Sequence, residues 1–246
     1  MKKEILEALK DQQQIFGDLL FEKITLNNDY KTKNENKLKV SEKINIPIGE
    51  SLLFDDFQKA ESLNELYDTI HNCKKCALGN TRINFVFGVG NPDADIMLIG
   101  EAPGAEEDKQ GIPFVGRAGK LLTDILKAIN FEREDVYIAN ILKCRPPNNR
   151  NPLPSEVETC IPYLYKQIEL IKPKLILCLG LVAANSLFGK KSTLTQMRGN
   201  VYDVQGIKTM VTYHPAALLR NPNWKRGCWE DVKKFRSIYD GLTENN

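Results

Sequence analysis

Short apolar runs alternate with longer amphipathic stretches through the part of the chain that follows residue 60. Glycine, proline or asparagine bounds each run, a composition typical of short buried strands that end in turns. Four runs are continuous enough for central strands, and they lie at residues 96–100, 136–142, 175–179 and 209–213. A further run at residues 201–204 predicts an edge strand or one arm of a hairpin.

The stretches between these runs have the apolar spacing of helices. Three intervening helices are predicted at residues 116–129, 155–171 and 181–188, and a last helix at about 224–239. Strands that alternate with helices predict a parallel sheet covered on both faces. The expected fold is therefore a three-layer α/β/α sandwich around a mostly parallel four-stranded sheet, with ligands bound at the carboxyl ends of the strands.

The first 60 residues have a different pattern. Residues 4–26 place apolar side chains at helical spacing, and residues 27–50 are polar and rich in asparagine and lysine, as linkers are. We therefore predict an N-terminal helical arm with a polar linker over residues 1–60 and an α/β domain over residues 61–246. Because the predicted helix has an apolar face, we expect residues 1–26 to dock a protein partner.

Composition narrows the class of protein. With 42% hydrophobic and 27% charged residues, the 246-residue chain is not collagen-like, fully disordered or a disulfide scaffold. The net charge of +2 does not by itself indicate a nucleic-acid partner, although residues 190–246 carry 10 basic and 5 acidic side chains. The chain starts without the apolar core of a secretory signal and has no run of the roughly 20 apolar residues that span a membrane. We therefore expect a cytoplasmic protein with no membrane partner and with reduced cysteines.

Four of the six cysteines have the spacing of a shared metal site: Cys73, Cys76, Cys144 and Cys160. Thiolates from scattered positions can hold a zinc ion or an iron–sulfur cluster, and the lack of a second C-x2-C pair mildly favours the cluster. The alternative is that Cys144 and Cys160 are buried as small hydrophobic side chains. Cys178 and Cys228 have no paired partner in the sequence and are expected to fill the core or the surface.

Polar residues follow the predicted strands, at the edge where ligands are expected. In the first loop, residues 100–119, an acidic cluster argues against a phosphate cradle and predicts that Glu106 and Asp108 are solvated. Phe114 in this loop is either a core residue or a stacking platform, and its immediate context favours the core. Asn140 lies inside an apolar strand, so its amide bonds the backbone or faces a ligand.

The loop after the last strand, YHPAALLRNP, begins with one of the two histidines of the chain. A lone histidine is more often structural than catalytic. Here, however, the strand end leads His214 into a proline-fixed loop with two leucines, which form an exposed apolar wedge, and with Arg220, a cation suited to a phosphate.

The loops and the cysteines together form a more specific pattern. The segments GEAPGAEEDKQGIPFVGRAG, YIANILKCRPPNNRNP and YHPAALLRNP, in this order, resemble the family 4 uracil-DNA glycosylases over about residues 62–240. The resemblance implies a monofunctional DNA glycosylase that flips uracil out of DNA and hydrolyses its N-glycosidic bond in base excision repair. It also implies that the four cysteines hold a [4Fe-4S] cluster rather than zinc, in a structural or DNA-positioning role.

The resemblance assigns the recognition of uracil to three residues. Phe114 is expected to stack on the base, and Asn140 to bond its polar edge. Cytosine presents a donor and an acceptor in exchanged positions, so one oriented amide would reject it. Glu107 is expected to form the wall that excludes the C5 methyl group of thymine.

The resemblance also assigns the catalytic and DNA-contacting residues. His214 is expected to donate to uracil O2 as negative charge develops there, and Glu101 with the backbone of Ala102 to position water and support the sugar cation. Ala102 stands where some glycosylases have a catalytic aspartate, so the group that activates water stays open, with Asn149 as a supporting residue. The expected DNA contacts are a wedge formed by Leu218 or Leu219 and a phosphate contact by Arg220.

Three alternatives follow from the same residues. The chain could be a non-catalytic iron–sulfur module that binds DNA in repair or replication. It could be an iron–sulfur electron carrier, for which the strand-end loops would be incidental. It could also be a glycosylase of broader range that acts on other deaminated bases such as hypoxanthine.

Overall fold

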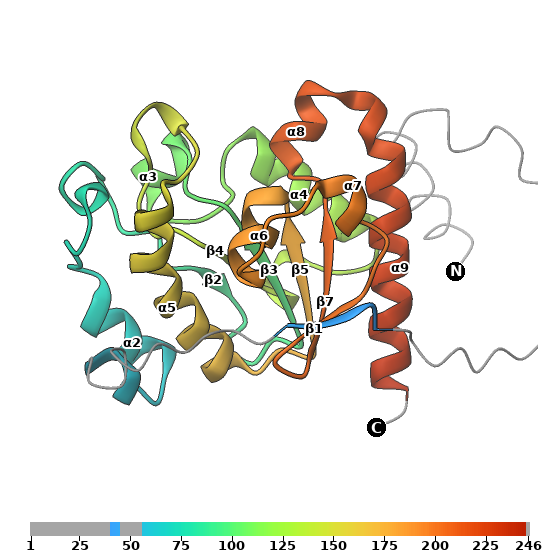
Figure 1. Cartoon of the computed structure of the whole chain (residues 1–246), viewed down its shortest axis with the longest axis horizontal. Helices are drawn as coiled ribbons and strands as arrows, with labels where there is room; N and C mark the ends of the chain where they lie inside the picture. The colour runs from blue at the N-terminus through green and yellow to red at the C-terminus, as the bar shows by residue number, and fades with distance from the viewer. Residues whose placement is uncertain (1–39, 45–55, 245–246) are drawn as a thin grey trace, which may run out of the picture.

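The computed structural model describes residues 40–44 and 56–244, which form a helix-covered sheet (Figure 1). Within the described residues the sheet has seven strands in the order β1-β6-β7-β5-β3-β4-β2. Their bounds are β1 Glu42–Ile44, β2 Val89–Gly90, β3 Ile96–Gly100, β4 Tyr137–Asn140, β5 Leu175–Leu179, β6 Tyr202–Val204 and β7 Ile207–Thr212.

The four predicted central strands form the middle of this sheet. The pairs β7–β5, β5–β3 and β3–β4 are parallel, and β6 and β7 form an antiparallel pair. The prediction of four strands is too small, because β1 adds in parallel to β6 and β2 adds antiparallel to β4. These edge strands have two or three residues each, too few to show a two-residue period in the sequence.

Helices cover both faces of the sheet. The α-helices of the described residues are α2 Leu63–Ile70, α3 Ala105–Gln110, α4 Arg117–Ala128, α5 Pro154–Ile171, α6 Leu181–Phe188, α7 Leu194–Met197, α8 Pro215–Arg220 and α9 Lys225–Thr243. Short 3-10 helices are η3 Asp56–Lys59, η4 Ala77–Asn80, η5 Arg133–Asp135, η6 Pro147–Asn149 and η7 Pro222–Trp224.

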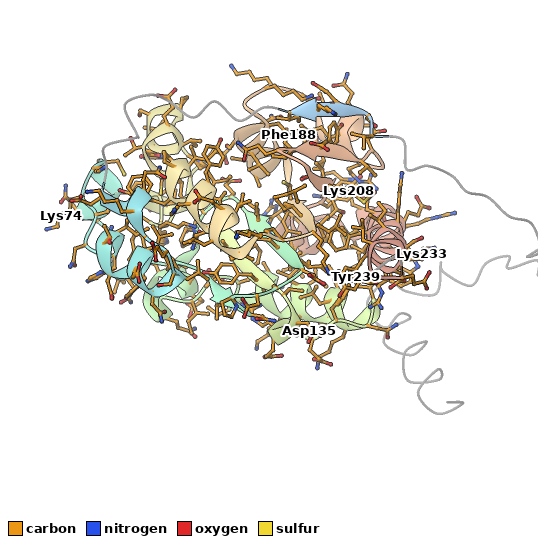
Figure 2. All side chains as sticks on the ribbon, turned by 90° about the horizontal axis from the view of Figure 1, so that it is seen from below. Lys74, Asp135, Phe188, Lys208, Lys233 and Tyr239 are labelled. Carbon is orange, nitrogen blue, oxygen red and sulfur yellow. The ribbon has the colours of Figure 1, made fainter. Side chains whose placement is uncertain are left out.

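Alternate residues of each central strand enter two separate cores. In β3, Met97 and Ile99 pack with residues of α2, α5 and α6, whereas Ile96 and Leu98 pack with residues of α4 and α9. A view from below shows side chains filling the layers between the sheet and the helices (Figure 2). The three-layer α/β/α arrangement is therefore confirmed, because every central strand is buried on both faces.

The segment before residue 60 contributes to this fold. The predicted helix at residues 4–26 lies outside the described residues, and so does the partner contact expected for it. Within the predicted linker, however, Glu42–Ile44 forms β1, and Phe57 of η3 is buried against the ring of Tyr163, with ring centroids 4.9 Å apart. The domain boundary near residue 60 stays a prediction.

Two loop predictions are corrected by the structure. The segment after β7, predicted as a loop, forms α8, since Pro215 occupies its first turn and the His214 side chain caps its N-terminus. Asp108, predicted to be solvated, is buried because its carboxylate accepts hydrogen bonds from the backbone of Ile83 and Asn84. No helix among the described residues is long and apolar enough to cross a membrane.

Candidate active site

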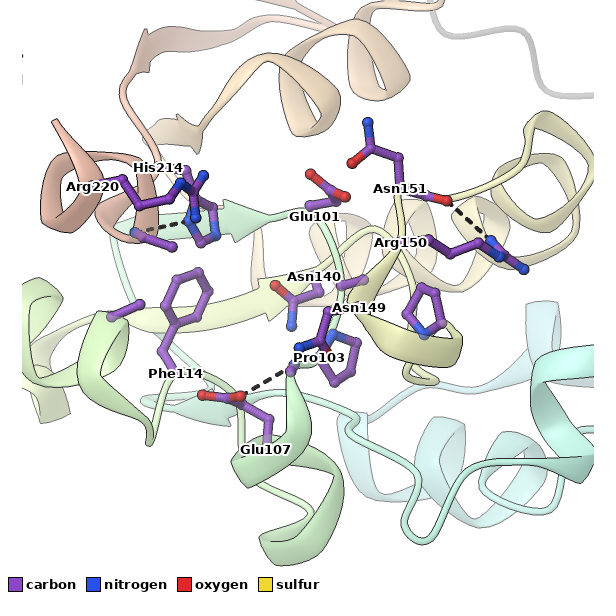
Figure 3. A pocket seen from close by; sticks show the side chains of 15 residues that line it. Glu101, Pro103, Glu107, Phe114, Asn140, Asn149, Arg150, Asn151, His214 and Arg220 are labelled. Atoms are coloured by element: carbon purple, nitrogen blue, oxygen red, sulfur yellow. Dashed lines mark hydrogen bonds between the residues drawn. The ribbon is translucent and has the colours of Figure 1, made fainter.

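A pocket of about 340 Å³ opens at the carboxyl ends of β3, β4 and β7 (Figure 3). Eight of the residues predicted from the sequence line it: Glu101, Ala102, Glu107, Phe114, Asn140, Asn149, His214 and Arg220. They come from the ends of three strands, β3, β4 and β7, and from the segments that follow them, so the order of strands in the sheet is what brings them together. Such a pocket at a strand-end rim is the usual ligand site of an open α/β sheet.

Phe114 occupies one wall of the pocket in a strained backbone conformation. Its φ angle is +54°, which non-glycine residues rarely adopt, and its side chain is buried. The Phe114 and His214 ring centroids lie 5.5 Å apart with the planes tilted by 30°. The ring is thus a buried core residue that also lines the pocket, and its role as a stacking platform stays a prediction.

Asn140 ends β4 with its amide directed into the pocket (Figure 3). It is 2% exposed, and its side-chain oxygen Oδ1 has no hydrogen-bond partner among the described residues. A buried polar atom without a partner is costly, so its retention at the base of a pocket points to a ligand. The backbone oxygen of Asn140 is held from below by the ammonium of Lys143, at 2.9 Å.

Gly100 leaves the space that these two side chains occupy. A Cβ atom at this position would lie 2.4 Å from Asn140 Oδ1 and 2.6 Å from the Phe114 ring. The sequence analysis did not single out Gly100. Its place at the end of an apolar strand, one residue before the acidic loop, is the signal that could have found it.

His214 reaches the pocket from the end of β7 as a neutral imidazole. Its Nδ1 accepts a hydrogen bond from the backbone N–H of Ala216 at 3.1 Å. Burial first, and the charge of Arg220 second, lower the pKa of His214 to about 4, against an opposing effect of Glu107. A neutral ring whose Nδ1 accepts must carry its proton on Nε2, which leaves one N–H donor free for a ligand.

Glu107 braces the loop that carries Phe114. Its Oε1 accepts from the backbone N–H groups of Val115 and Gly116, each at 2.9 Å, and its Oε2 accepts from Gly104 at 3.1 Å. One carboxylate therefore joins the start of α3 to the start of α4. The side chain lines the pocket, and its hydrogen bonds hold it in one position.

Glu101 and Asn149 lie on the opposite side of the pocket from Phe114. Burial raises the pKa of Glu101, and no hydrogen bond to its carboxylate is present among the described residues. Asn149 is exposed on η6, where its Oδ1 accepts from Arg145 Nε at 2.7 Å. Ala102 presents no side-chain polar group, so the carboxylate available for water at this wall is that of Glu101.

The leucines of α8 differ in exposure. Leu218 is fully buried in the core formed with α4 and α9, whereas Leu219 is 38% exposed. Of the two residues predicted as a wedge, Leu219 is therefore the one that DNA can reach. Arg220, at the end of the same helix, extends along the rim of the pocket next to His214 (Figure 3).

The four predicted ligand cysteines lie near one another, and hydrogen-bond donors face three of their sulfur atoms. Arg82 Nη1 donates to Cys144 Sγ at 3.0 Å, the Tyr163 hydroxyl to Cys73 Sγ at 3.3 Å, and the Lys143 backbone N–H to Cys160 Sγ at 3.3 Å. Burial raises the pKa of Cys144, Arg82 lowers it, and the nearby Cys76 and Cys73 raise it. Donors aimed at thiolate sulfurs are typical of iron–sulfur sites.

The spacing of these thiols bears on the choice of metal. Within the described residues, no three His, Cys, Asp or Glu side chains are close enough together to hold a single ion. A tetrahedral zinc site would need all four sulfurs within about 2.3 Å of one atom, whereas in a cluster each sulfur binds a different iron. The donor set, four thiols from three segments of the chain, is one that a zinc ion or an iron–sulfur cluster can use.

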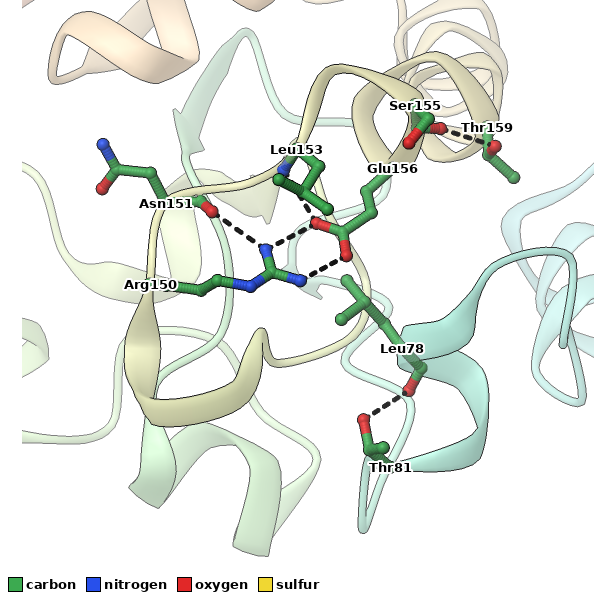
Figure 4. Close-up of polar contacts among 8 residues, drawn as sticks. All are labelled: Leu78, Thr81, Arg150, Asn151, Leu153, Ser155, Glu156 and Thr159. Atoms are coloured by element: carbon green, nitrogen blue, oxygen red, sulfur yellow. Dashed lines mark hydrogen bonds and ion pairs between the residues drawn. The ribbon is translucent and has the colours of Figure 1, made fainter.

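A buried ammonium and an ion pair in this region were not predicted from the sequence. The Lys143 ammonium is fully buried and donates to Gln167 Oε1 at 2.5 Å as well as to Asn140, and burial lowers its pKa to about 8. Arg150 and Glu156 form a two-point ion pair, at 2.6 and 2.9 Å, that closes the loop after β4 onto α5 (Figure 4). Gln167 and Glu156 lie on α5, so neither pairing can be read from the sequence of the loop KCRPPNNR.

Fold and pocket together match a known class of DNA-repair proteins. The model of the Uracil DNA glycosylase superfamily matches residues 87–233. Within that superfamily, the chain belongs to the type-4 uracil-DNA glycosylases. It is 48% identical over 186 residues to the Type-4 uracil-DNA glycosylase of Archaeoglobus fulgidus, covering 72% of this chain and 94% of that protein. It is 45% identical over 186 residues to that of Thermotoga maritima, covering 74% of this chain and 97% of that protein.

Proposed function

We propose that this protein is a uracil-DNA glycosylase that flips uracil out of DNA and hydrolyses its N-glycosidic bond, leaving an abasic site for base excision repair. The observation that carries the proposal is one pocket in which a ring, an unpartnered amide oxygen and a neutral imidazole meet, at Phe114, Asn140 and His214. Membership of the type-4 family supports the choice of uracil.

Extrusion of the base from the DNA duplex is the first step that requires free energy. Unstacking and unpairing a base costs a few kcal/mol, which contacts to the distorted DNA must offset. Leu219 is the exposed apolar side chain that would fill the gap, and Arg220 would hold a phosphate at the rim.

Recognition of uracil follows from the state of Asn140. Its unpartnered Oδ1 would accept the N3–H of uracil, and its amide would donate to O4, while the Phe114 ring covers a face of the base. Cytosine has no hydrogen on N3, so its N3 and Asn140 Oδ1 would face each other as two acceptors without a proton between them. Each unpaired buried group costs about 1–3 kcal/mol, which is enough to reject the commonest competing base.

Exclusion of thymine must be steric, because its hydrogen-bonding edge is that of uracil. Glu107 is the proposed wall against the C5 methyl group. The three backbone N–H groups that hold its carboxylate support this role, since a fixed side chain excludes a methyl group better than a mobile one.

Cleavage develops negative charge on the departing uracil and positive charge on the sugar. The neutral His214 would donate from Nε2 to uracil O2, a contribution of about 3 kcal/mol for oxyanion donors of this kind. The Glu101 carboxylate, with the backbone of Ala102, would position water and stabilise the sugar cation, and Asn149 would support the same wall.

Cys73, Cys76, Cys144 and Cys160 would hold a [4Fe-4S] cluster, with Arg82 and Tyr163 as donors to its ligands. When bound, the cluster supplies a cross-link between three segments of the chain; hydrolysis itself transfers no electrons. The backbone of Lys143 and the ammonium of the same residue link this site to Cys160 and to Asn140. The cluster would thus support the strand that carries the recognition amide.

An end-labelled oligonucleotide with a single uracil tests the proposal. The protein is incubated with it in single- and double-stranded form, and alkali then cleaves any abasic site. We expect cleavage at uracil but not at thymine or cytosine, and a loss of about 100-fold or more in rate for His214→Ala with the visible absorbance of the cluster unchanged.

Other outcomes select the alternatives. Intact strands with retained DNA binding would identify a non-catalytic module. If His214→Ala has the same activity as wild type, the role assigned to His214 is contradicted. An electron carrier would give this result, because its function would not depend on His214. Equal cleavage at hypoxanthine would widen the substrate class to other deaminated bases.

A further inference from the structure

A stack of three planar groups stands beside the pocket, outside the residues that line it. The Tyr213 and Trp224 rings are parallel to within 17°, with centroids 5.1 Å apart. The Arg198 guanidinium lies 4.1 Å from the Tyr213 centroid. Trp224 is 41% exposed. The stack therefore ends in an aromatic surface that is open to solvent.

Buried partners hold this stack rigid. Arg198 Nε donates to Asp231 Oδ2 at 2.7 Å, and its Nη1 donates to the Tyr213 hydroxyl at 2.7 Å. The same carboxylate oxygen accepts from the Thr212 hydroxyl at 2.7 Å. A ring fixed before a ligand arrives loses little conformational entropy on binding. The core needs Arg198 and Tyr213 for this network, but it does not need an exposed indole.

The stack adjoins the proposed DNA-contacting residues. Tyr213 immediately precedes His214, and Trp224 follows Arg220 by four residues, in a turn where its backbone N–H donates to Asn221 at 3.1 Å. α8 and the start of α9 lie at the same edge of the sheet (Figure 1). With consecutive Cα atoms about 3.8 Å apart, Trp224 lies within roughly 15 Å of Arg220, a distance that a few nucleotides span.

The charge around Trp224 suits a nucleic-acid strand. Arg226 is exposed, and its exposed partner Glu230 lies 3.7 Å away, a contact that water screens. Lys225 lies between Trp224 and Arg226, and Asp231 is neutralised by Arg198. An exposed aromatic ring among cations is the usual combination for binding unpaired bases, because every base offers a π face and every nucleotide a phosphate.

We infer that Trp224 is a stacking platform for an unpaired DNA base that flanks the extruded nucleotide. The inference rests on the proposed function, because the extruded uracil defines the position of the flanking base. It adds a second base-binding position, with no sequence preference, that favours single-stranded or locally opened DNA.

Product-like DNA tests the platform without cleavage. Single-stranded, dye-labelled oligonucleotides carry a tetrahydrofuran abasic analogue at the target position. The neighbouring bases, one or two positions away on either side, are natural in one set and replaced one at a time by the same spacer in the other. Fluorescence anisotropy at fixed salt measures Kd for the cluster-containing wild type, Trp224→Ala and Trp224→Phe.

We expect one flanking spacer to weaken wild-type binding about five-fold or more. Trp224→Ala should weaken binding to the natural oligonucleotide by a similar factor and be insensitive to that spacer, whereas Trp224→Phe should keep most of the effect. Tyr67→Ala is the control, because Tyr67 is also 41% exposed but lies on α2. In excision assays, Trp224→Ala should raise KM and leave kcat unchanged.

The inference is overturned if Trp224→Ala binds as wild type does, or if it stays equally sensitive to the spacers. Should that happen while both proteins excise uracil, the proposed function stands and the platform alone fails. A wild type that leaves uracil-containing DNA intact would remove the proposed function, and the platform with it.

Discussion

Single atoms determine what the pocket can recognise. Asn140 is buried with one unpartnered oxygen, and His214 is half-buried with one free N–H donor. In both residues a polar group that lines the pocket has no protein partner, and a bound uracil would supply one. A polar group without a partner destabilises the folded protein. Removal of such a group should therefore raise the free energy of unfolding and lower the activity.

Asn140→Leu tests this opposition. The leucine has a similar shape but no polar atoms, so the free energy of unfolding should stay the same or rise by up to about 1 kcal/mol. The kcat/KM for uracil should fall by about 10- to 100-fold, as expected for the loss of buried hydrogen bonds. Urea denaturation and the excision assay measure the two effects.

Asn185→Leu is the matched control for that experiment. The Asn185 amide accepts from the Ser192 backbone at 3.1 Å, so its removal should destabilise the protein without an effect on uracil recognition. Clear destabilisation by Asn140→Leu would show that its oxygen has a structural partner after all.

His214 should make stability depend on pH in a defined window. Its pKa is about 4 in the folded protein and about 6.5 when unfolded, so above pH 6.5 both states are neutral. Below pH 6.5 the unfolded chain binds a proton that the folded protein does not. The free energy of unfolding should therefore fall by about 1.5 kcal/mol from pH 6.5 to 5 through this residue alone.

Urea denaturation of wild type and His214→Gln across this range isolates the effect. The difference between the two proteins should change with pH by that amount, whereas parallel curves would mean that His214 titrates normally in the folded state. Because the ring is already neutral, the titration of His214 should not contribute to the pH profile of kcat/KM between pH 5 and 8. Wild type and His214→Gln should therefore have profiles of the same shape in this range.

At the scale of elements, the approach of α4 to the preceding turn holds Phe114 in place. Gly119 lies in the first turn of α4, and a Cβ atom there would be 1.9 Å from the Phe114 carbonyl oxygen. The positive φ of Phe114 and the absence of a side chain at Gly119 thus belong to one feature. Glu107 closes the same turn from α3.

Gly119→Ala should push this turn out of position. Because the contact is with backbone, which cannot rotate away, we expect destabilisation of about 1–3 kcal/mol together with a loss of excision activity. Gly241→Ala is the control, since Gly241 lies in α9 with no atom within 4 Å of the added Cβ, and it should stabilise by about 0.5–1 kcal/mol. Thermal unfolding of both variants decides; equal stability of Gly119→Ala and wild type would contradict the argument.

At the scale of the whole molecule, the cysteine site joins parts of the chain that the sheet does not. Cys73 and Cys76 lie between α2 and η4, Cys144 follows β4, and Cys160 lies in α5. Arg82 strengthens the same junction by donating to the Cys73 carbonyl at 2.7 Å and to the Cys144 sulfur. The segment from η3 to residue 82 contributes no strand to the sheet, so it is attached through this junction and through buried apolar side chains such as Phe57, Leu66 and Ile70.

If the proposed [4Fe-4S] cluster is bound at this junction, its removal should loosen that segment first. Hydrogen exchange of the chelator-treated protein should show lost protection over residues 56–82, with β5 and β7 still protected. Cys160→Ala should reproduce this pattern and lose the visible absorbance, while Cys178→Ala, another buried cysteine, should keep both. Uniform loss of protection would mean that the cluster supports the entire fold.

The amino-acid sequence by itself determined the elements with strong local patterns. The residues of β3, β5 and α6 were predicted to the residue, because continuous apolar runs and helical spacing are local properties. The chemistry of the loops was also readable, since four cysteines, an amide in a strand and a histidine at a strand end restrict what those segments can do.

Only the tertiary structure decided which of these groups meet and which are buried. Phe114, Asn140 and His214 are separated by up to 100 residues and share a pocket because β3, β4 and β7 end at one edge of the sheet. The short strands β1 and β2 exist through pairing with other strands, and the opposite exposures of Leu218 and Leu219 depend on how α8 packs. Such contacts depend on the packing of distant segments, and no local pattern in the sequence contains that information.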